Sequence, residues 1–171
     1  MAGPLRPKEI IATLAEYRVA YVMIGGLAAV LHGSPTVTSD ADICPDRSLR
    51  NLERLAHALQ AMHARIRTHA EPDGVEFACD AATLSRMKMV NLTTDFGDFD
   101  LSFEPAGFSG YEELLANAVE VPVAGTVATV ASLDDVIRSK EIANRDKDRA
   151  TLPVLYALQD EIADLRRRRP G

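Results

Sequence analysis

Three aspartates are the residues of this chain best suited to chemistry. Asp40 and Asp42 form an Asp-Ala-Asp sequence, and Asp100 lies in a second acidic segment, Phe99–Phe103. Residues two apart in an extended strand project from the same face, so the first two carboxylates should lie together. An aspartate on a neighbouring strand completes a cluster of three, which cannot stay fully ionised without a cation. Carboxylate oxygens suit Mg²⁺ (or Mn²⁺), which leaves positions for water and substrate phosphates.

Two glycines upstream supply the complementary feature. Gly25 and Gly26 follow the apolar run Tyr21–Ile24, which predicts a buried strand, and residues 27–31 predict a short helix. A Gly-Gly turn lets the backbone approach a phosphate closely, and the start of the helix offers free N–H groups. A triphosphate would then lie between backbone donors and a metal ion. Ser39, directly before the acidic pair, is a further candidate contact to the nucleotide.

The order of these motifs resembles that of the nucleotidyltransferase superfamily with the polymerase-β-like fold. Its pattern is Gly-Gly or Gly-Ser after a strand, a spacer, Asp-x-Asp, and a later lone Asp. This chain has Gly25 and Gly26, then Asp40 and Asp42, then Asp100. The resemblance implies a mixed sheet flanked by helices, with further helices at the C-terminal end.

Two later segments also take part in the resemblance. Residues 132–140 and 145–148 resemble the C-terminal signature of small bacterial members, which include AbiEii-type toxin nucleotidyltransferases. The resemblance makes Lys140 a phosphate contact and Asp148 a residue that orients it or a neighbouring group. Arg145 and Lys147 are weaker candidates. Read from charge alone, the same residues would form a solvated helix face.

The resemblance implies transfer of a nucleotidyl group from a nucleoside triphosphate such as ATP to an acceptor. Asp40 and Asp42 would hold the metal that bridges the phosphates, and Asp100 would bind a second ion or act as the base for the acceptor hydroxyl. The toxin-like relatives favour tRNA or protein as the acceptor and imply a cognate antitoxin as a partner. A small molecule such as an antibiotic is the alternative acceptor.

Two observations keep other functions open. Relatives often carry Arg at the position of Thr36, so either another basic residue supplies that charge or activity is reduced. A non-catalytic nucleotide- or partner-binding protein with the same fold is therefore a second hypothesis. A metal-dependent phosphohydrolase is a third, disfavoured because the chain has no cluster of histidines. Asp98 shares a strand face with Asp100 and is the alternative metal ligand; the family pattern, with an apolar residue after the Asp, favours Asp100.

Length and composition set the remaining expectations. A chain of 171 residues with 47% hydrophobic residues predicts one folded domain, residues 1–171, with a core over about 19–131 and a helical part over about 132–168. A net charge of −6 and the absence of Trp argue against a broad nucleic-acid surface. Basic residues nevertheless gather late, over 140–149 and 166–169, and would give a local positive path for a macromolecular acceptor.

The remaining patterns predict the elements that position these residues. No apolar run is long enough to cross a membrane, and two cysteines, expected to remain reduced, favour a cytoplasmic protein. A four-residue connection over 95–98 predicts a hairpin that presents Asp100 at the edge of a cleft. Periodicity predicts helices over 7–18, 49–66, 81–87, 111–117, 132–144 and 146–168, and strands over 40–44, 75–79, 89–94, 99–103, 119–123 and 126–130.

Overall fold

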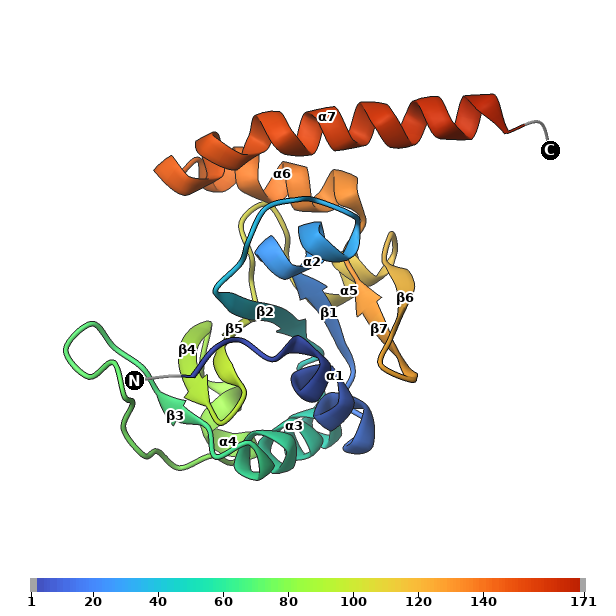
Figure 1. Cartoon of the computed structure of the whole chain (residues 1–171). Coiled ribbons are helices and arrows are strands. Elements are labelled where there is room, and N and C mark those ends of the chain that lie inside the picture. Colours follow the sequence, from blue (N-terminus) through green and yellow to red (C-terminus); the bar gives the residue numbers. More distant parts are fainter. Residues whose placement is uncertain (1–2, 170–171) are drawn as a thin grey trace.

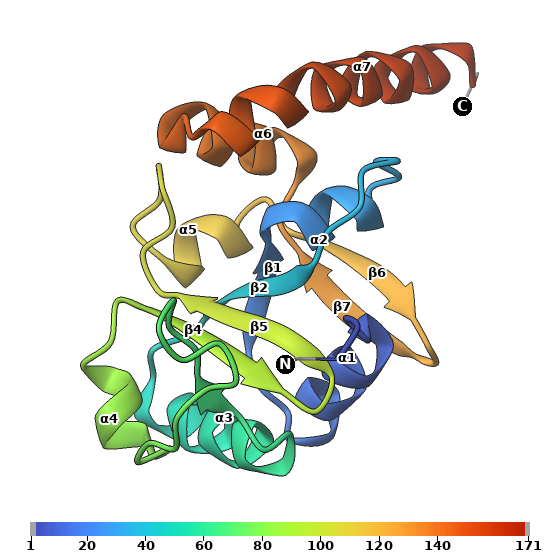
Figure 2. The same cartoon turned by 60° about the vertical axis from the view of Figure 1, so that its left-hand side comes forward.

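The computed structural model describes residues 3–169 and is built on a mixed sheet of seven strands in the order β3-β4-β5-β2-β1-β7-β6 (Figure 1). Helices α1, α3 and α4 lie together on one side, and α6 and α7 lie on the opposite side (Figures 1 and 2). The predicted mixed α/β fold with C-terminal helices is therefore confirmed. The strands are β1 (Tyr21–Ile24), β2 (Asp40–Pro45), β3 (Arg65–Ile66), β4 (Met89–Thr94), β5 (Gly97–Ser102), β6 (Val119–Val123) and β7 (Thr126–Val130). The helices are α1 (Pro7–Glu16), α2 (Gly25–Leu31), α3 (Leu49–Ala61), α4 (Ala81–Ser85), α5 (Tyr111–Leu115), α6 (Leu133–Ala143) and α7 (Asp146–Arg168).

The two acidic strands, β2 and β5, are neighbours at the centre of the sheet. They run parallel, with Asp40 opposite Asp98 and Asp42 opposite Asp100. On the other side, β2 pairs antiparallel with β1. The side chains of β2 and β5 alternate between the two faces of the sheet, as the period of an extended strand requires. All four acids therefore project from one face.

The opposite face of the same strands belongs to the hydrophobic core. Ala41 and Ile43 of β2 and Phe99 and Leu101 of β5 are fully buried there, together with apolar side chains of α1 and α3. Burying a side chain of this size contributes about 1.5–3 kcal/mol. The carboxylates are thus attached to strands whose other face is packed in the core, which fixes their relative positions. The helix residues in this core include Ile10, Ile11 and Leu14 of α1 and Leu52, Leu55 and Leu59 of α3.

The prediction of one helix over 49–66 was wrong at its C-terminal end. Helix α3 ends at Ala61, and the chain turns at His63, whose φ of 51° lies in the left-handed region. Residues 65–66 then pair with β4 as strand β3. Ile66 follows Met62 at helical spacing. The apolar pattern therefore continues across the turn and does not indicate where the helix ends.

The predicted strand over 75–79 was also wrong, because only Val75 joins the sheet, through a single bridge to Ile66. The following residues run along α3 instead. There the Gln60 side chain donates to the carbonyl of Cys79 at 2.7 Å and so satisfies a group that a strand would have paired. The β4–β5 hairpin is confirmed, but β5 begins at Gly97, so its turn is shorter than the predicted connection over 95–98.

The C-terminal helices follow the predicted limits closely. Ser132 caps α6 by accepting a hydrogen bond from the Asp135 N–H at 3.1 Å, and Asn144 ends it in the left-handed conformation. Helix α7 begins at Asp146 and extends past the rest of the molecule at its C-terminal end (Figures 1 and 2). Among residues 3–169, neither this helix nor any other is long and apolar enough to cross a membrane.

Candidate functional site

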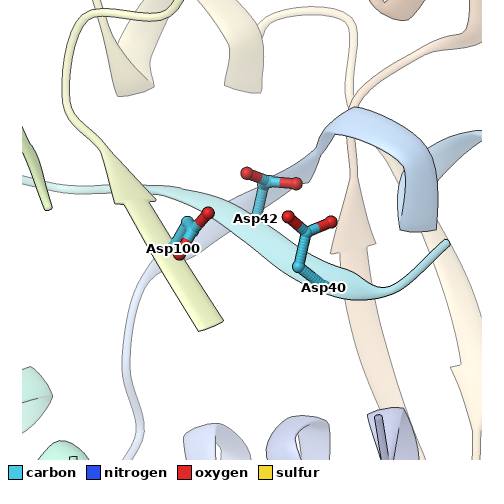
Figure 3. Close-up of side chains that lie close together, drawn as sticks. All are labelled: Asp40, Asp42 and Asp100. Atoms are coloured by element: carbon cyan, nitrogen blue, oxygen red, sulfur yellow. The ribbon is translucent and has the colours of Figure 1, made fainter. Parts of the chain in front are cut away.

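The three aspartates singled out by their spacing meet at the centre of the sheet. Asp40 and Asp42 of β2 and Asp100 of β5 each present an oxygen to a shared space, and these oxygens lie within 4.8 Å of one another (Figure 3). Each residue is partly buried. An arrangement of three carboxylate oxygens at this separation suits a hard divalent cation such as Mg²⁺. The donor set and its geometry therefore fit the metal that the sequence motifs suggest.

The electrostatics of the cluster favour the binding of a cation. Burial, followed by the charges of Asp40 and Asp100, raises the pKa of Asp42 to about 7. Burial also raises the pKa of Asp100 to about 6, and the Arg67 guanidinium limits that rise. Like charges this close disfavour full ionisation, whereas a bound cation favours it. Metal binding would thus release a proton from the cluster near neutral pH.

Gly25 lies directly against the acids, and Gly26 lies against the loop that precedes them. Gly25 begins α2 with a φ of +68°, and a Cβ atom added there would lie 2.6 Å from Oδ2 of Asp42. A Cβ atom on Gly26 would lie 2.7 Å from Oγ1 of Thr38, in the loop that leads into β2. Both contacts would be shorter than Cβ atoms normally make, so glycine at position 25 lets the backbone approach Asp42 this closely, and glycine at position 26 does the same for Thr38.

A cleft of about 710 Å³ opens above the acids. This volume is within the range of 300–1,000 Å³ that is usual for small-molecule sites. The β1–α2 turn and the loop before β2 form one wall, and α6 with the start of α7 forms another. Lining side chains and backbone come from Gly25, Gly26, Ser39, Asp40, Asp42, Arg67, Asn91, Asp100, Ser102, Glu104, Lys140, Arg145 and Lys147, among others.

Lys140 and Asp148 form one unit at the α6–α7 junction. Lys140 lines the cleft, whereas Asp148 is fully buried behind it, with Lys140 Nζ 3.4 Å from Asp148 Oδ1. Arg145 donates to Asp148 through its backbone N–H at 3.2 Å and through Nε at 2.7 Å. Burial would raise the pKa of Asp148, but the hydrogen bonds from Arg145 outweigh it and hold that pKa below its usual value. Asp148 thus positions two cations of the cleft wall.

The structure adds a residue that sequence reasoning missed. Arg67 lines the cleft and contacts both Asp98 and Asp100. Asp98, the alternative ligand, faces this arginine and is not part of the three-carboxylate cluster. The prediction of a helix over 49–66 left no place for strand β3, which directly precedes Arg67 and brings it to the site. Had β3 been recognised, the alternation Arg-Ile-Arg over 65–67 would have placed both arginines on one strand face.

The late basic residues do not form one continuous path. Lys140, Arg145 and Lys147 line the cleft. The arginines at 166–168 lie at the other end of α7. At a rise of 1.5 Å per residue, residue 166 lies about 28 Å along the helix from residue 147. The positive charge at the site is therefore local.

Comparison with solved structures identifies the fold. The lincosamide antibiotic adenylyltransferase LnuA, in its lincomycin-bound form, aligns with a TM-score of 0.59 and 13% identity over 91% of this chain and 99% of that one. A putative nucleotidyltransferase from Thermotoga maritima aligns with a TM-score of 0.55 and 18% identity over 87% and 92%. The antibiotic-resistance factor ANT(2″)-Ia aligns with a TM-score of 0.54 and 13% identity over 94% and 89%. No protein-family profile and no curated sequence matches the chain. At these identities the likeness establishes a nucleotidyltransferase fold.

Proposed function

We propose that this protein is a metal-dependent nucleotidyltransferase that moves a nucleoside monophosphate from a triphosphate to an acceptor hydroxyl. The observation that carries the proposal is the convergence of Asp40, Asp42 and Asp100 beneath a glycine turn in one cleft. The nucleotidyltransferase fold of the structural neighbours supports it. A carboxylate cluster whose charges oppose one another favours a protein that binds a cation over a binding protein without a metal.

The reaction assigns a task to each carboxylate. The acceptor oxygen forms a bond to the α-phosphorus, the bond from that phosphorus to the bridging oxygen breaks, and pyrophosphate leaves. Asp40 and Asp42 would hold a Mg²⁺ or Mn²⁺ ion, which, when bound, neutralises phosphate charge and stabilises the attacking and leaving oxygens. Asp100 would complete the metal site or accept the proton of the acceptor hydroxyl. A pKa raised to about 6 suits the second task at neutral pH.

The walls of the cleft would hold the triphosphate. Gly25 and Gly26 allow the phosphates to approach the backbone, and Ser39 offers a hydroxyl beside the acidic strand. Lys140 would contribute a point charge to a phosphate, held in place by Asp148. Arg145 and Lys147 line the same wall and provide the basic character that Thr36 does not.

The cleft favours a small hydroxyl-bearing molecule as the acceptor. Its volume suits a small molecule beside a nucleotide. In addition, two structural neighbours that align over 91% and 94% of this chain are named as an antibiotic adenylyltransferase and an antibiotic-resistance factor. A tRNA or protein acceptor, with a toxin role and a cognate antitoxin, is the second candidate. It draws on the resemblance of residues 132–148 to the C-terminal signature of toxin-like members and on the cations that line the cleft.

The test is a labelling experiment with triphosphates that carry the label on the α-phosphate. Each of the four nucleotides is incubated with Mg²⁺ and three separate acceptor pools: total RNA, total protein, and a panel of hydroxylated antibiotics and metabolites. Label on a small molecule supports the first acceptor, and label on RNA or protein supports the second. The Asp40→Asn/Asp42→Asn variant should label nothing. Label transferred equally well by that variant would contradict the proposed function.

A further inference from the structure

Arg67 is anchored at both ends. Its backbone N–H donates to the carbonyl of Asn91 at 2.8 Å, which continues the pairing of β3 with β4 by one residue. Its guanidinium reaches β5, where Nη2 donates to Oδ1 of Asp100 at 3.0 Å. Nε lies 3.3 Å from Oδ2 of Asp98. The side chain of Arg67 is 26% exposed and that of Asp100 is 13% exposed, so little water competes for this contact.

Asp100 receives both of its hydrogen bonds on the same oxygen. Oδ1 accepts from Arg67 and, at 3.3 Å, from the backbone N–H of Leu92. Within residues 3–169, no donor contacts Oδ2 of Asp100. Figure 3 shows one oxygen of this carboxylate directed toward the other two aspartates and the other directed away. The carboxylate is therefore held in one orientation, with one oxygen left for the site.

The guanidinium of Arg67 is oriented for a hydrogen bond to Asp100 rather than to Asp98. The contact with Asp100 is a hydrogen bond, whereas Nε of Arg67 and Oδ1 of Asp98 are both buried without a hydrogen-bond partner. A pair formed for its own stability would satisfy these atoms, because buried polar groups are nearly always hydrogen-bonded. Asp98 contributes charge beside the guanidinium, and the directed bond goes to Asp100.

We propose that Arg67 is a positioning residue for the metal site, which fixes Asp100 as a ligand through one oxygen. The inference rests on the proposed function, and within it on the role in which Asp100 completes the metal site. Groups that hydrogen-bond to a metal ligand orient it, and their loss typically weakens metal binding by 10–100-fold. A cation that acted only through its charge would have the opposite effect, because removing a positive charge strengthens the binding of another cation.

The sign of the change in metal affinity therefore tests the assignment. Mn²⁺ is titrated into the protein, and free Mn²⁺ is measured by electron paramagnetic resonance. Four proteins are compared: wild type, Arg67→Gln, Asp100→Asn, and the double variant that carries both substitutions. Arg65→Gln is the matched control, because Arg65 is an exposed arginine two residues away and its loss changes the net charge equally. We expect Arg67→Gln to bind Mn²⁺ about tenfold more weakly than wild type, and Arg65→Gln to bind it as tightly as wild type or more tightly.

The double variant shows whether Arg67 acts through Asp100. In that case Arg67→Gln has no further effect once Asp100 is asparagine, so the two losses are not additive. Unchanged or stronger Mn²⁺ binding by Arg67→Gln, or additive losses, would overturn the assignment while leaving the metal site intact. Wild-type protein that binds no Mn²⁺ would overturn the proposed function and this role with it. Arg67→Lys replaces Arg67→Gln in the same cycle if the glutamine variant does not fold.

Discussion

Asp42 and Asp100 lie directly opposite each other on the parallel strands β2 and β5. Parallel neighbours in register point their side chains to the same face, so the pairing forces two carboxylates together on a half-buried surface. Burial is the main cause that raises the pKa of both groups, to about 7 for Asp42 and about 6 for Asp100. The charges of Asp40 and Asp100 add to the rise at Asp42, and the charge of Asp40 adds to the rise at Asp100. The fold thus holds carboxylates together in a half-buried cluster, and a bound cation would reduce the repulsion among them.

The pH dependence of folding stability should reveal the raised pKa of Asp42. The folded-state pKa of Asp42, about 7, lies above its ordinary value of 3.8. The stability that its proton provides is therefore complete below about pH 4 and is lost as pH rises through 7. Asp42→Asn cannot ionise, so in EDTA it should be more stable than wild type at pH 8 and nearly equal at pH 4. Urea denaturation at the two pH values measures this.

Asp160→Asn, on the exposed surface of α7, is the matched control for that experiment and should show no comparable gain at pH 8. Adding Mg²⁺ to the wild type at pH 8 should recover part of the stability. Equal stability of wild type and Asp42→Asn at pH 8 would mean that Asp42 is not under electrostatic stress.

Gly25→Ala should destroy the close approach of the turn to the acids. The substitution forces a residue with a side chain to a φ of +68°, which costs about 1–2 kcal/mol. It also places a Cβ atom 2.6 Å from Asp42 Oδ2. Gly125→Ala shares the backbone cost at a φ of +81° but meets nothing within 4 Å. Thermal melts and nucleotide titrations of both variants should show a similar loss of stability or less in Gly125→Ala, with nucleotide binding impaired only in Gly25→Ala.

Lys140→Ala should lower the affinity for the triphosphate more than it lowers the stability of the fold. A hydrogen bond to a charged group contributes about 1.5–3 kcal/mol, which corresponds to a Kd raised roughly 10- to 150-fold. Calorimetric titration of nucleotide with Mg²⁺ measures the change, with the exposed Lys8→Ala as control. If both variants bind like wild type, Lys140 belongs to the helix junction alone and not to the nucleotide site.

Asp148→Ala should destabilise the junction of α6 and α7. It removes a fully buried carboxylate that pairs with Lys140 and Arg145, a loss that typically costs about 3–5 kcal/mol. Arg145 is largely exposed, which places the expected value at the lower end. Because the pKa of Asp148 is lowered, its contribution is present above about pH 4 and is lost as pH falls further. Chemical denaturation at pH 7 and pH 3 should show a larger difference from wild type at pH 7 than at pH 3.

The sequence predicted local spacing well and long-range pairing poorly. Asp40 and Asp42 could be placed on one face because a strand has a period of two, and Gly25 could be placed at a turn because only glycine favours such backbone. Their meeting with Asp100 needed a particular register between β2 and β5, which no local pattern specifies. The resemblance of the motif order supplied that link.

Arg67 shows where reasoning from periodicity failed. Met62 and Ile66 continue the apolar spacing of α3, although the chain turns between them at His63. The pairing of Arg65 and Ile66 with β4 overrides the helical pattern, since tertiary contacts decide such short segments. Arg67 reaches the acids only because of that pairing, so a helix over the same residues could not reveal it.

Ligand-dependent thermal stabilisation tests the central claim, a site for metal and triphosphate built on Asp40 and Asp42, most directly. Melting temperatures are measured for wild type and Asp40→Asn/Asp42→Asn, with Mg²⁺ alone, each triphosphate alone, and both together. Ligand at 100 times its Kd stabilises the folded state by about 2.7 kcal/mol. Wild type should gain some stability with Mg²⁺ alone and the most with Mg²⁺ and a triphosphate together, and the variant should gain none. An equal gain in the variant would contradict the account, because the nucleotide would then bind without the two aspartates.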